Sequence, residues 1–287
     1  MADFVIITDS SCDLSTDKVA EYGIKVASLE LNIDGMGTVL NHEINPKEAY
    51  ALLREKKGIK TAAANMDKFT ELFEAELVAG NDVLYLGFSS GLSATFMAGK
   101  NAALDLSEKY PERKIIAIDT LCASLGQGLL VTLACRKKEE GATIDEVAQF
   151  VEETKLHLCH WFTVDDLFFL KRGGRISAAT AIVGTMLAFK PVLHVDNDGH
   201  LINVTKVRGR RAAIAALFEK MKETAIDPKS QTVYICHGDC YDDAKILADM
   251  ITEEFGITDI LIDFTGPVIG AHSGPGTLAL FYIGTER

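Results

Sequence analysis

The 287-residue sequence lacks long hydrophobic runs and any excess of basic residues. No stretch reaches the roughly 18 uninterrupted apolar residues that a membrane-spanning helix needs. The opening MADFVIITDSS has no basic leader of a signal or transit peptide. Lys and Arg number 29 against 41 Asp and Glu, and the net charge of -12 argues against nonspecific binding to nucleic acid or anionic membranes. We therefore expect a cytoplasmic protein without stable membrane insertion and without a nucleic-acid partner.

Signatures of cofactor binding are missing as well. The chain has no G-x-x-x-x-G-K-[ST] loop and no G-x-G-x-x-G after its first apolar run, which argues against binding of ATP or a dinucleotide by this chain itself. Cys236 and Cys240 flank His237 without C-x-x-C spacing or a second pair, which argues against zinc. The six cysteines are scattered through a long chain, and this favours reduced thiols over a disulfide framework. We expect neither a cofactor nor a metal.

The first half of the chain alternates strand-like and helix-like segments. Apolar runs typical of strands occupy residues 4–8, 24–33, 82–88 and 114–119. Helical periodicity predicts helices over residues 46–57, 66–80 and 143–158. Alternation of this kind predicts an α/β fold with a mostly parallel sheet covered by helices on both faces.

The second half has a different pattern. Strand-like runs at residues 191–195 and 201–207 enclose DNDGHL, in which Asp198-Gly199 is a hairpin signal. Two further runs, at 232–238 and 257–264, accompany helical patterns at 211–223 and 242–255. We predict two α/β domains, residues 1–155 with the parallel sheet and residues 156–287 with a mixed or antiparallel sheet.

The stretch NDVLYLGFSSGLSATF reads as a strand, a Gly-Ser turn and the start of a helix. Ligands of open α/β sheets usually lie beyond the carboxyl ends of the strands, where this turn falls. Backbone N–H groups, the helix dipole and the hydroxyls of Ser89, Ser90 and Ser93 would favour a carboxylate or a phosphate there. The alternative is that Ser90 or Ser93 only caps the helix.

A catalytic interpretation of the same turn also stays open. Gly91-Leu92-Ser93-Ala94-Thr95 approaches the G-x-S-x-G elbow of serine hydrolases but lacks its second glycine. His272 would be the general base, although no acid stands out as its orienting partner. The second candidate function is therefore a serine hydrolase or acyltransferase that uses Ser93 and His272.

Two other stretches could contribute to a site. TGPVIGAHSGPGTLAL, residues 265–280, surrounds His272 with Gly and Pro and predicts a rigid, tightly turned loop. Basic residues gather around Gly173-Gly174 and again near residue 208: Lys171, Arg172, Arg175, Lys206, Arg208, Arg210 and Arg211. They could bind phosphate groups or an acidic partner, or be solvated helix ends.

Several of these stretches together resemble the DegV family. They are IITDSSCDLS near the start, Thr61, FSSGLSATF, AIDTLCASLGQGLLV, LKRGGRIS and IGAHSGPGTLAL. They occur in the order and approximate positions of the family, so the resemblance covers essentially the whole chain. Each is weakly specific alone, but their joint occurrence is specific.

The resemblance implies a fatty-acid-binding protein that in many bacteria is the binding subunit of fatty acid kinase. The acyl chain would lie in a tunnel between the two domains. Its carboxyl group would be presented to a separate kinase subunit, which phosphorylates it with ATP to an acyl-phosphate. The implied ligand is a long-chain fatty acid of about 16–18 carbons, for which burial of about 14 methylenes at ~0.8 kcal/mol each gives at most ~11 kcal/mol before ordering costs.

The resemblance also assigns roles to residues. Thr61, Ser93 and His272 would hydrogen-bond the ligand carboxylate, with a contribution from the backbone of Ala94. Ser93 would then be a hydrogen-bond donor rather than a nucleophile, and the chain would have no catalytic activity of its own. Arg175 and Arg208 match family positions on the face that meets the kinase, so they are expected to affect docking rather than lipid affinity.

Two departures from the family pattern concern the geometry around the carboxylate. Family members commonly continue the threonine at 61 as Thr-Ser-Gln-Pro, whereas this chain has alanines at 62–64. A glycine commonly follows the serine that matches Ser93, and here it is Ala94. Both changes bear on the choice of ligand but leave the three carboxylate-binding side chains in place.

Overall fold

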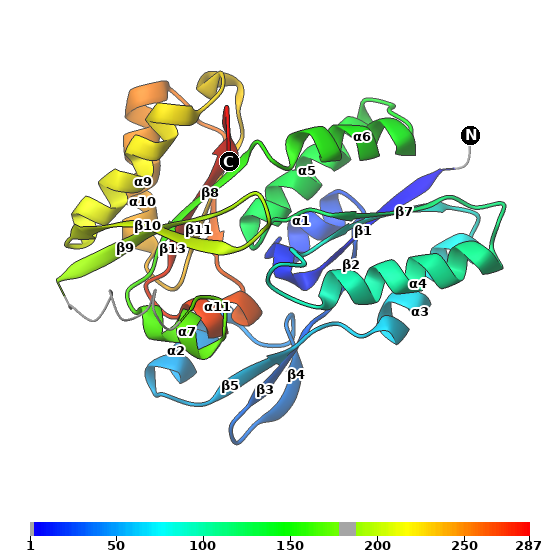
Figure 1. The fold of residues 1–287 in the computed structure, drawn as a ribbon, viewed down its shortest axis with the longest axis horizontal. Helices are drawn as coiled ribbons and strands as arrows, with labels where there is room; N and C mark the ends of the chain where they lie inside the picture. Colours follow the sequence, from blue (N-terminus) through cyan, green and yellow to red (C-terminus); the bar gives the residue numbers. More distant parts are fainter. Residues whose placement is uncertain (1–2, 178–187) are drawn as a thin grey trace.

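The computed structural model describes residues 3–177 and 188–287, which form three β-sheets surrounded by helices (Figure 1). Sheet A is wholly parallel and has the order β2 (Lys25–Ala27), β1 (Phe4–Asp9), β6 (Asp82–Gly87), β7 (Ile115–Asp119). Its central strands β1 and β6 are apolar and buried at nearly every position, as expected of strands covered on both faces. The prediction of a mostly parallel sheet in the first half is confirmed.

Sheet C is mixed, as predicted for the second half. Its order is β10 (Leu201–Arg208), β9 (Phe189–Val195), β8 (Leu158–Thr163), β13 (Leu278–Ile283), β11 (Val233–His237), β12 (Ile260–Phe264). Strands β9 and β10 form the predicted antiparallel hairpin, whose turn contains Gly199 at φ 78°. Only β11 and β12 pair in parallel among the described strands of this sheet.

Sheet B is a small antiparallel sheet that the sequence analysis did not predict. It consists of β4 (Gly37–Leu40), β3 (Glu30–Ile33) and β5 (Ile59–Ala62). The apolar run at 24–33 is therefore two strands, β2 in sheet A and β3 in sheet B. Its continuous hydrophobicity hides the break because both strands contribute to one core between sheets A and B.

The helices mostly begin where capping residues stand. They are α1 (Thr16–Glu21), α2 (Pro46–Arg54), α3 (Met66–Val78), α4 (Thr95–Lys109), α5 (Leu125–Glu139), α6 (Ile144–Thr154), α7 (Leu167–Arg172), α9 (Arg210–Thr224), α10 (Tyr241–Phe255) and α11 (Pro267–Ser273), with short 3₁₀ turns at Ser10–Cys12 and Pro228–Ser230. A capping box of Thr143 and Glu146 starts α6. The helix predicted over 143–158 is wrong at its C-terminal end, because the chain turns after Thr154 and enters β8 at Leu158.

Helix α5 joins the two large sheets. It packs against β1 of sheet A and against β8, β11 and β13 of sheet C, and one hydrophobic core runs through it. Ten of its residues are buried, so it has little amphipathic character. Helices α3 and α4 lie on the other side of sheet A, and α9 and α10 on the outer side of sheet C (Figure 1). The division into residues 1–155 and 156–287 stays a prediction.

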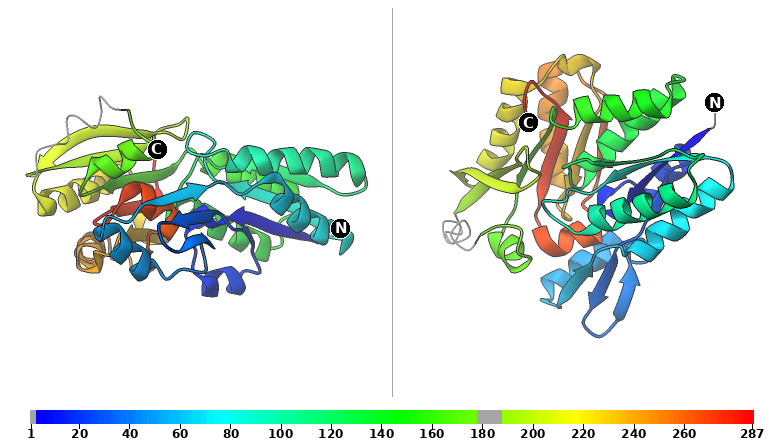
Figure 2. Two further views of the ribbon diagram at one scale, coloured as in Figure 1. Left: turned by 90° about the horizontal axis from the view of Figure 1, so that it is seen from below. Right: turned by 45° about the vertical axis from the view of Figure 1, so that its right-hand side comes forward.

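The molecule is elongated and flat, with sheets A and C following one another along its length (Figure 2). Sheet B, α2, α7 and α11 gather at their junction (Figure 1). Within residues 3–177 and 188–287, no helix is long and apolar enough to cross a lipid bilayer.

Candidate functional site

A cavity of about 230 Å³ lies where the three sheets meet. Most of its wall is apolar and comes from both halves of the chain, including Leu29, Phe88, Phe162, Val268 and Phe281. Thr61, Ser93, Ala94, Arg175 and His272 also line it. The structure thus brings together, around one cavity, all the carboxylate-binding residues that the sequence analysis proposed.

Thr61 and His272 are in direct contact, although they come from opposite halves of the chain. Thr61 lies on β5, an edge strand of sheet B, and its Oγ1 is 2.7 Å from Nε2 of His272. His272 lies in the last turn of α11 and not in the loop that the sequence predicted. Pro267 at the first position of α11 has a φ suited to a helix, so the Gly- and Pro-rich stretch forms a short helix before its tight turn at Gly274.

The imidazole of His272 is neutral at physiological pH. Burial, followed by the positive charges of Arg175 and Arg172, lowers the pKa of His272 to about 4. A neutral imidazole has one N–H donor and one acceptor nitrogen, and Nδ1 is buried without a hydrogen-bond partner. The ring therefore acts through Nε2.

Ser93 lies in the turn between β6 and α4, as predicted. Its Oγ accepts the backbone N–H of Thr95 at 3.2 Å and is 2.9 Å from Oγ1 of Thr95. This supports the capping interpretation in part, because the hydroxyl satisfies one N-terminal amide of the helix. When Thr95 donates both bonds, the hydroxyl hydrogen of Ser93 remains for a ligand. Ala94 is the N-cap of α4 and has no side-chain capping bond.

The other serines of this turn have different surroundings. Ser89 is fully buried and donates to the carbonyl of Gly199 at 2.9 Å, so it ties the turn to the β9–β10 hairpin. Ser90 is exposed, and its backbone N–H donates to Asp119. Neither lines the cavity.

The two arginines assigned to partner docking lie in different environments. Arg175 is partly buried and lines the cavity; its Nε donates to the carbonyl of Leu92 at 3.1 Å and its Nη1 to the carbonyl of Gly173. Burial lowers the pKa of Arg175, but a guanidinium remains charged near neutral pH. Arg208 is exposed at the end of β10 and does not line the cavity.

A second polar group, here called the Asp13 network, was missed by the sequence analysis; its members Ser124, Cys236 and Thr265 line the cavity, and Asp13 lies behind them. Ser124 Oγ donates to Asp13 at 2.5 Å and lies 3.4 Å from Sγ of Cys236, to which Thr265 donates at 3.0 Å. Burial raises the pKa of Asp13 to about 7. A usable signal existed: Ser124 follows β7, so it falls at the same sheet edge as the turn after β6.

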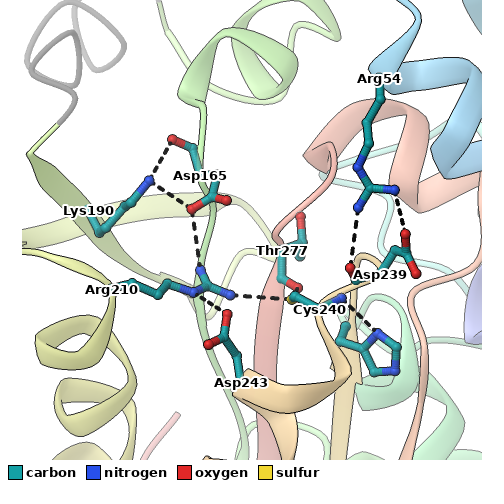
Figure 3. A network of polar contacts seen from close by, with 9 residues as sticks. Arg54, Asp165, Lys190, Arg210, Asp239, Cys240, Asp243 and Thr277 are labelled. Atoms are coloured by element: carbon teal, nitrogen blue, oxygen red, sulfur yellow. Dashed lines mark hydrogen bonds and ion pairs between the residues drawn. The ribbon is translucent and has the colours of Figure 1, made fainter.

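A polar network at the base of α2 and α7 fixes the elements that carry the site (Figure 3). Arg54 at the end of α2 pairs with Asp239, which follows β11. Asp165, just before α7, is held by Lys190 at 2.7 Å and by Arg210 at 3.8 Å. In the part of the chain that the structure describes, no cluster of three His, Cys, Asp or Glu side chains could hold a metal ion.

The geometry suits an organic anion with an apolar tail. Hydroxyls, a neutral imidazole, a helix N-terminus and a guanidinium line a cavity whose wall is mostly apolar. Hydrogen bonds to an ionised acceptor are roughly twice as strong as neutral ones.

Sequence and structure comparisons point to one family. Residues 3–285 match the sequence model of the family described as uncharacterised protein, DegV family. A DegV domain-containing protein of Clostridium perfringens is 44% identical over 289 residues, which span 100% of this chain and 99% of the relative.

Solved structures agree in fold. A DegV family protein from Thermus thermophilus, described by its fatty acid binding, has a TM-score of 0.87 and 28% identity over 99% of this chain and 100% of that one. A DegV lipid binding protein from Thermotoga maritima has a TM-score of 0.86 and 28% identity over 99% of both chains. These similarities confirm the predicted fold class.

Proposed function

Because this chain belongs to the DegV family, we propose that it binds one long-chain fatty acid noncovalently in the cavity and presents the carboxylate to a separate, ATP-dependent fatty acid kinase subunit. The product of that kinase would be an acyl-phosphate. Fatty acid or lipid binding is what the descriptions of the similar Thermus and Thermotoga proteins state. The kinase step rests on the resemblance of the sequence motifs to the family.

One observation carries the ligand assignment. Thr61, Ser93 and His272 line the same apolar cavity, and the hydroxyls of the first two keep hydrogen-bonding capacity beyond their contacts within the protein. Buried polar groups normally use their full capacity inside the protein, so unused capacity beside a cavity indicates a ligand. The charge of Arg175 favours an anionic head group there.

The docking roles rest on the resemblance together with position. Arg208 is exposed on β10, where a partner can reach it. Arg175 lies at the cavity wall, so we propose that it links the bound head group with the docking face. The chain itself would act in the cytoplasm as a binding subunit without catalytic activity.

The contacts of Ser93 and His272 weigh against the alternative of a serine hydrolase or acyltransferase. Ser93 bonds to Thr95, and Nε2 of His272 bonds to Thr61. A nucleophile and its base need to share a hydrogen bond, and the base needs an orienting partner. The described contacts include no bond between Ser93 and His272, and Nδ1 has no partner.

The ligand assignment is tested by Ser93→Ala and His272→Ala. Ser93→Ala removes a hydrogen bond to a charged group, worth about 1.5 kcal/mol, and His272→Ala removes the ring that orients the hydroxyl of Thr61. Each variant should therefore bind hexadecanoate about tenfold more weakly while the protein stays folded. Fatty acid extracted from the purified protein and a binding titration measure this. Ser90→Ala, in the same turn but outside the cavity, is the matched control and should bind as the wild type does. Unchanged lipid content in both variants would refute the head-group assignment.

A fluorophosphonate probe separates the two candidate functions. We expect no labelling of the folded wild-type protein, because Ser93 lacks an activating base. Labelling that Ser93→Ala abolishes would favour the hydrolase.

A further inference from the structure

Gly173 and Gly174 are adjacent glycines that are needed for opposite reasons. Gly174 has φ 72°, which side-chain-bearing residues rarely adopt, but a Cβ there would meet nothing within 4 Å. Gly173 has φ -73° and ψ -9°, an ordinary helical conformation that alanine adopts freely. A Cβ at Gly173 would lie 2.2 Å from Nδ1 of His272, 3.2 Å from its Cγ and 3.3 Å from its Cε1. The absence of a side chain at 173 is therefore required by the imidazole and not by the backbone.

The turn that contains Gly173 is held in place. The backbone N–H groups of Gly173, Gly174 and Arg175 donate to carbonyls of α7 at 3.0, 2.9 and 2.9 Å. The guanidinium of Arg175 donates to the carbonyl of Gly173. Asp165 before α7 is anchored by Lys190 (Figure 3). When a side chain is added at 173, the part that yields is the ring of His272.

The ring is thus confined between two elements. Its Nδ1 edge faces the backbone of Gly173, and its Nε2 edge meets Oγ1 of Thr61 at 2.7 Å. Nδ1 has no hydrogen-bond partner in either tautomer. A bare lone pair can face the Cα–H groups of Gly173, whereas a hydrogen on Nδ1 would be pressed against the same backbone. We therefore assign the proton to Nε2, which donates to Thr61.

We propose that Gly173 is a positioning residue: its bare backbone holds His272 as an Nε2–H donor to Thr61, so that the hydroxyl hydrogen of Thr61 is directed to the ligand carboxylate. This inference rests on the proposed function for the identity of the ligand. It gives the LKRGGRIS motif a role inside the head-group site, separate from docking of a partner.

The charged groups around the ring fit this role. Arg172 and Arg175, from the C-terminal end of α7 and its turn, both disfavour the imidazolium. Tyr50 of α2 packs against Gly270 of α11, and burial raises its pKa well above the usual value, so it is neutral. The ring accordingly donates as a neutral group.

Gly173→Ala tests the proposal in a double-mutant cycle with His272→Ala. We expect Gly173→Ala alone to weaken hexadecanoate binding about tenfold, since the ring leaves Thr61. In the His272→Ala background, where the Cβ meets no ring, the same change should alter affinity less than about twofold. Gly174→Ala is the control: it adds the same methyl group one residue later, strains the turn and leaves the ring in place. An equal loss in both backgrounds would overturn the proposal.

The ring itself is observed by NMR of the ligand-free protein with ¹⁵N-labelled histidine. The wild type and Gly174→Ala should show the Nε2–H tautomer with a pKa near 4 for His272. Gly173→Ala should show mixed tautomers and a pKa raised toward 6.5, the value of a solvated ring. An unchanged tautomer and pKa in Gly173→Ala would contradict the proposal. If the wild type binds no hexadecanoate, the proposed function fails, and the NMR spectra still decide the role of Gly173.

Discussion

Two histidines line the same cavity and have opposite surroundings. His160 on β8 has both ring nitrogens occupied by backbone: Nδ1 lies 3.0 Å from the carbonyl of Leu158, and Nε2 accepts from Ala123 at 3.3 Å. His272 has one contact, to a side-chain hydroxyl, and one unpartnered nitrogen. Burial is the main cause of a lowered pKa in both. The two histidines therefore differ in their hydrogen-bond partners and not in the direction of their pKa shift.

The same contrast separates the two polar groups of the cavity wall. In the Asp13 network, Ser124 donates to Asp13 and contacts Cys236, to which Thr265 donates, and Oδ1 of Asp13 is buried without a hydrogen-bond partner. Around Thr61 and Ser93, each hydroxyl keeps hydrogen-bonding capacity beyond its contacts within the protein. Asp13 itself does not line the cavity, whereas Thr61 and Ser93 do, so a ligand in the cavity can use the remaining hydrogen-bonding capacity of these two hydroxyls.

The largest expected effect concerns Asp13. Burial raises its folded-state pKa to about 7, whereas a free aspartate titrates near 3.9. Between these values the folded protein holds a proton that the unfolded chain has lost. The free energy of unfolding therefore falls as the pH rises from 4 to 7, by up to about 4 kcal/mol from this group.

Asp13→Asn should abolish this pH-dependent loss of stability, because asparagine has the shape of the protonated acid and does not titrate. Relative to the wild type, the variant should gain up to about 4 kcal/mol on going from pH 4 to pH 8. Urea denaturation at the two pH values measures this difference. Asp105→Asn, an exposed site on α4, is the control. If the free energies of unfolding of Asp13→Asn and the wild type differ by the same amount at both pH values, Asp13 titrates normally.

Replacing the two histidines should have the next largest effect on the free energy of unfolding. His160→Ala leaves a buried space and takes away the acceptor of the Ala123 N–H, so it should lower the free energy of unfolding by about 3 kcal/mol. His272→Ala removes one hydrogen bond of a partly buried ring and should cost about 1 kcal/mol. Denaturant titration of both variants gives the comparison. Equal losses would mean that His272 is as structural as His160.

The smallest expected effect is on the pH dependence of binding. With a pKa of about 4, His272 stays neutral from pH 6 to 8. A fatty acid is ionised throughout this range, since carboxyl groups titrate near pH 4. Hexadecanoate affinity should therefore change less than about twofold between pH 6 and 8. A tenfold fall as the pH rises through 6.5 would show instead that an imidazolium binds the carboxylate.

The elements that could be predicted from the sequence were apolar runs such as those of β1, β6 and β11, amphipathic helices, and stretches with a strong turn signal. The turn at Ser93 and the hairpin at Asp198-Gly199 belong to this group. Helix α5 was missed because it is buried on nearly all sides and has no amphipathic period. Strand β13 was missed because it begins at Leu278, inside the Gly- and Pro-rich stretch 265–280 that was predicted to be a loop.

Only some residues of the candidate site could be identified from the sequence. Ser93 and His272 stand out from their Gly-rich surroundings, whereas Thr61 lies on a short edge strand without a pattern and was identified only through family resemblance. The contact of Gly173 with His272 joins residues far apart in the sequence. Only the packing of α7 against α11 reveals it.

Mass spectrometry of the purified protein, first under native and then under denaturing conditions, tests the central claim most directly. A noncovalent carrier should show a native mass excess of one fatty acid that disappears on denaturation, with the acid recovered in an organic extract. An excess that survives denaturation would contradict this account and indicate an acyl-enzyme on Ser93.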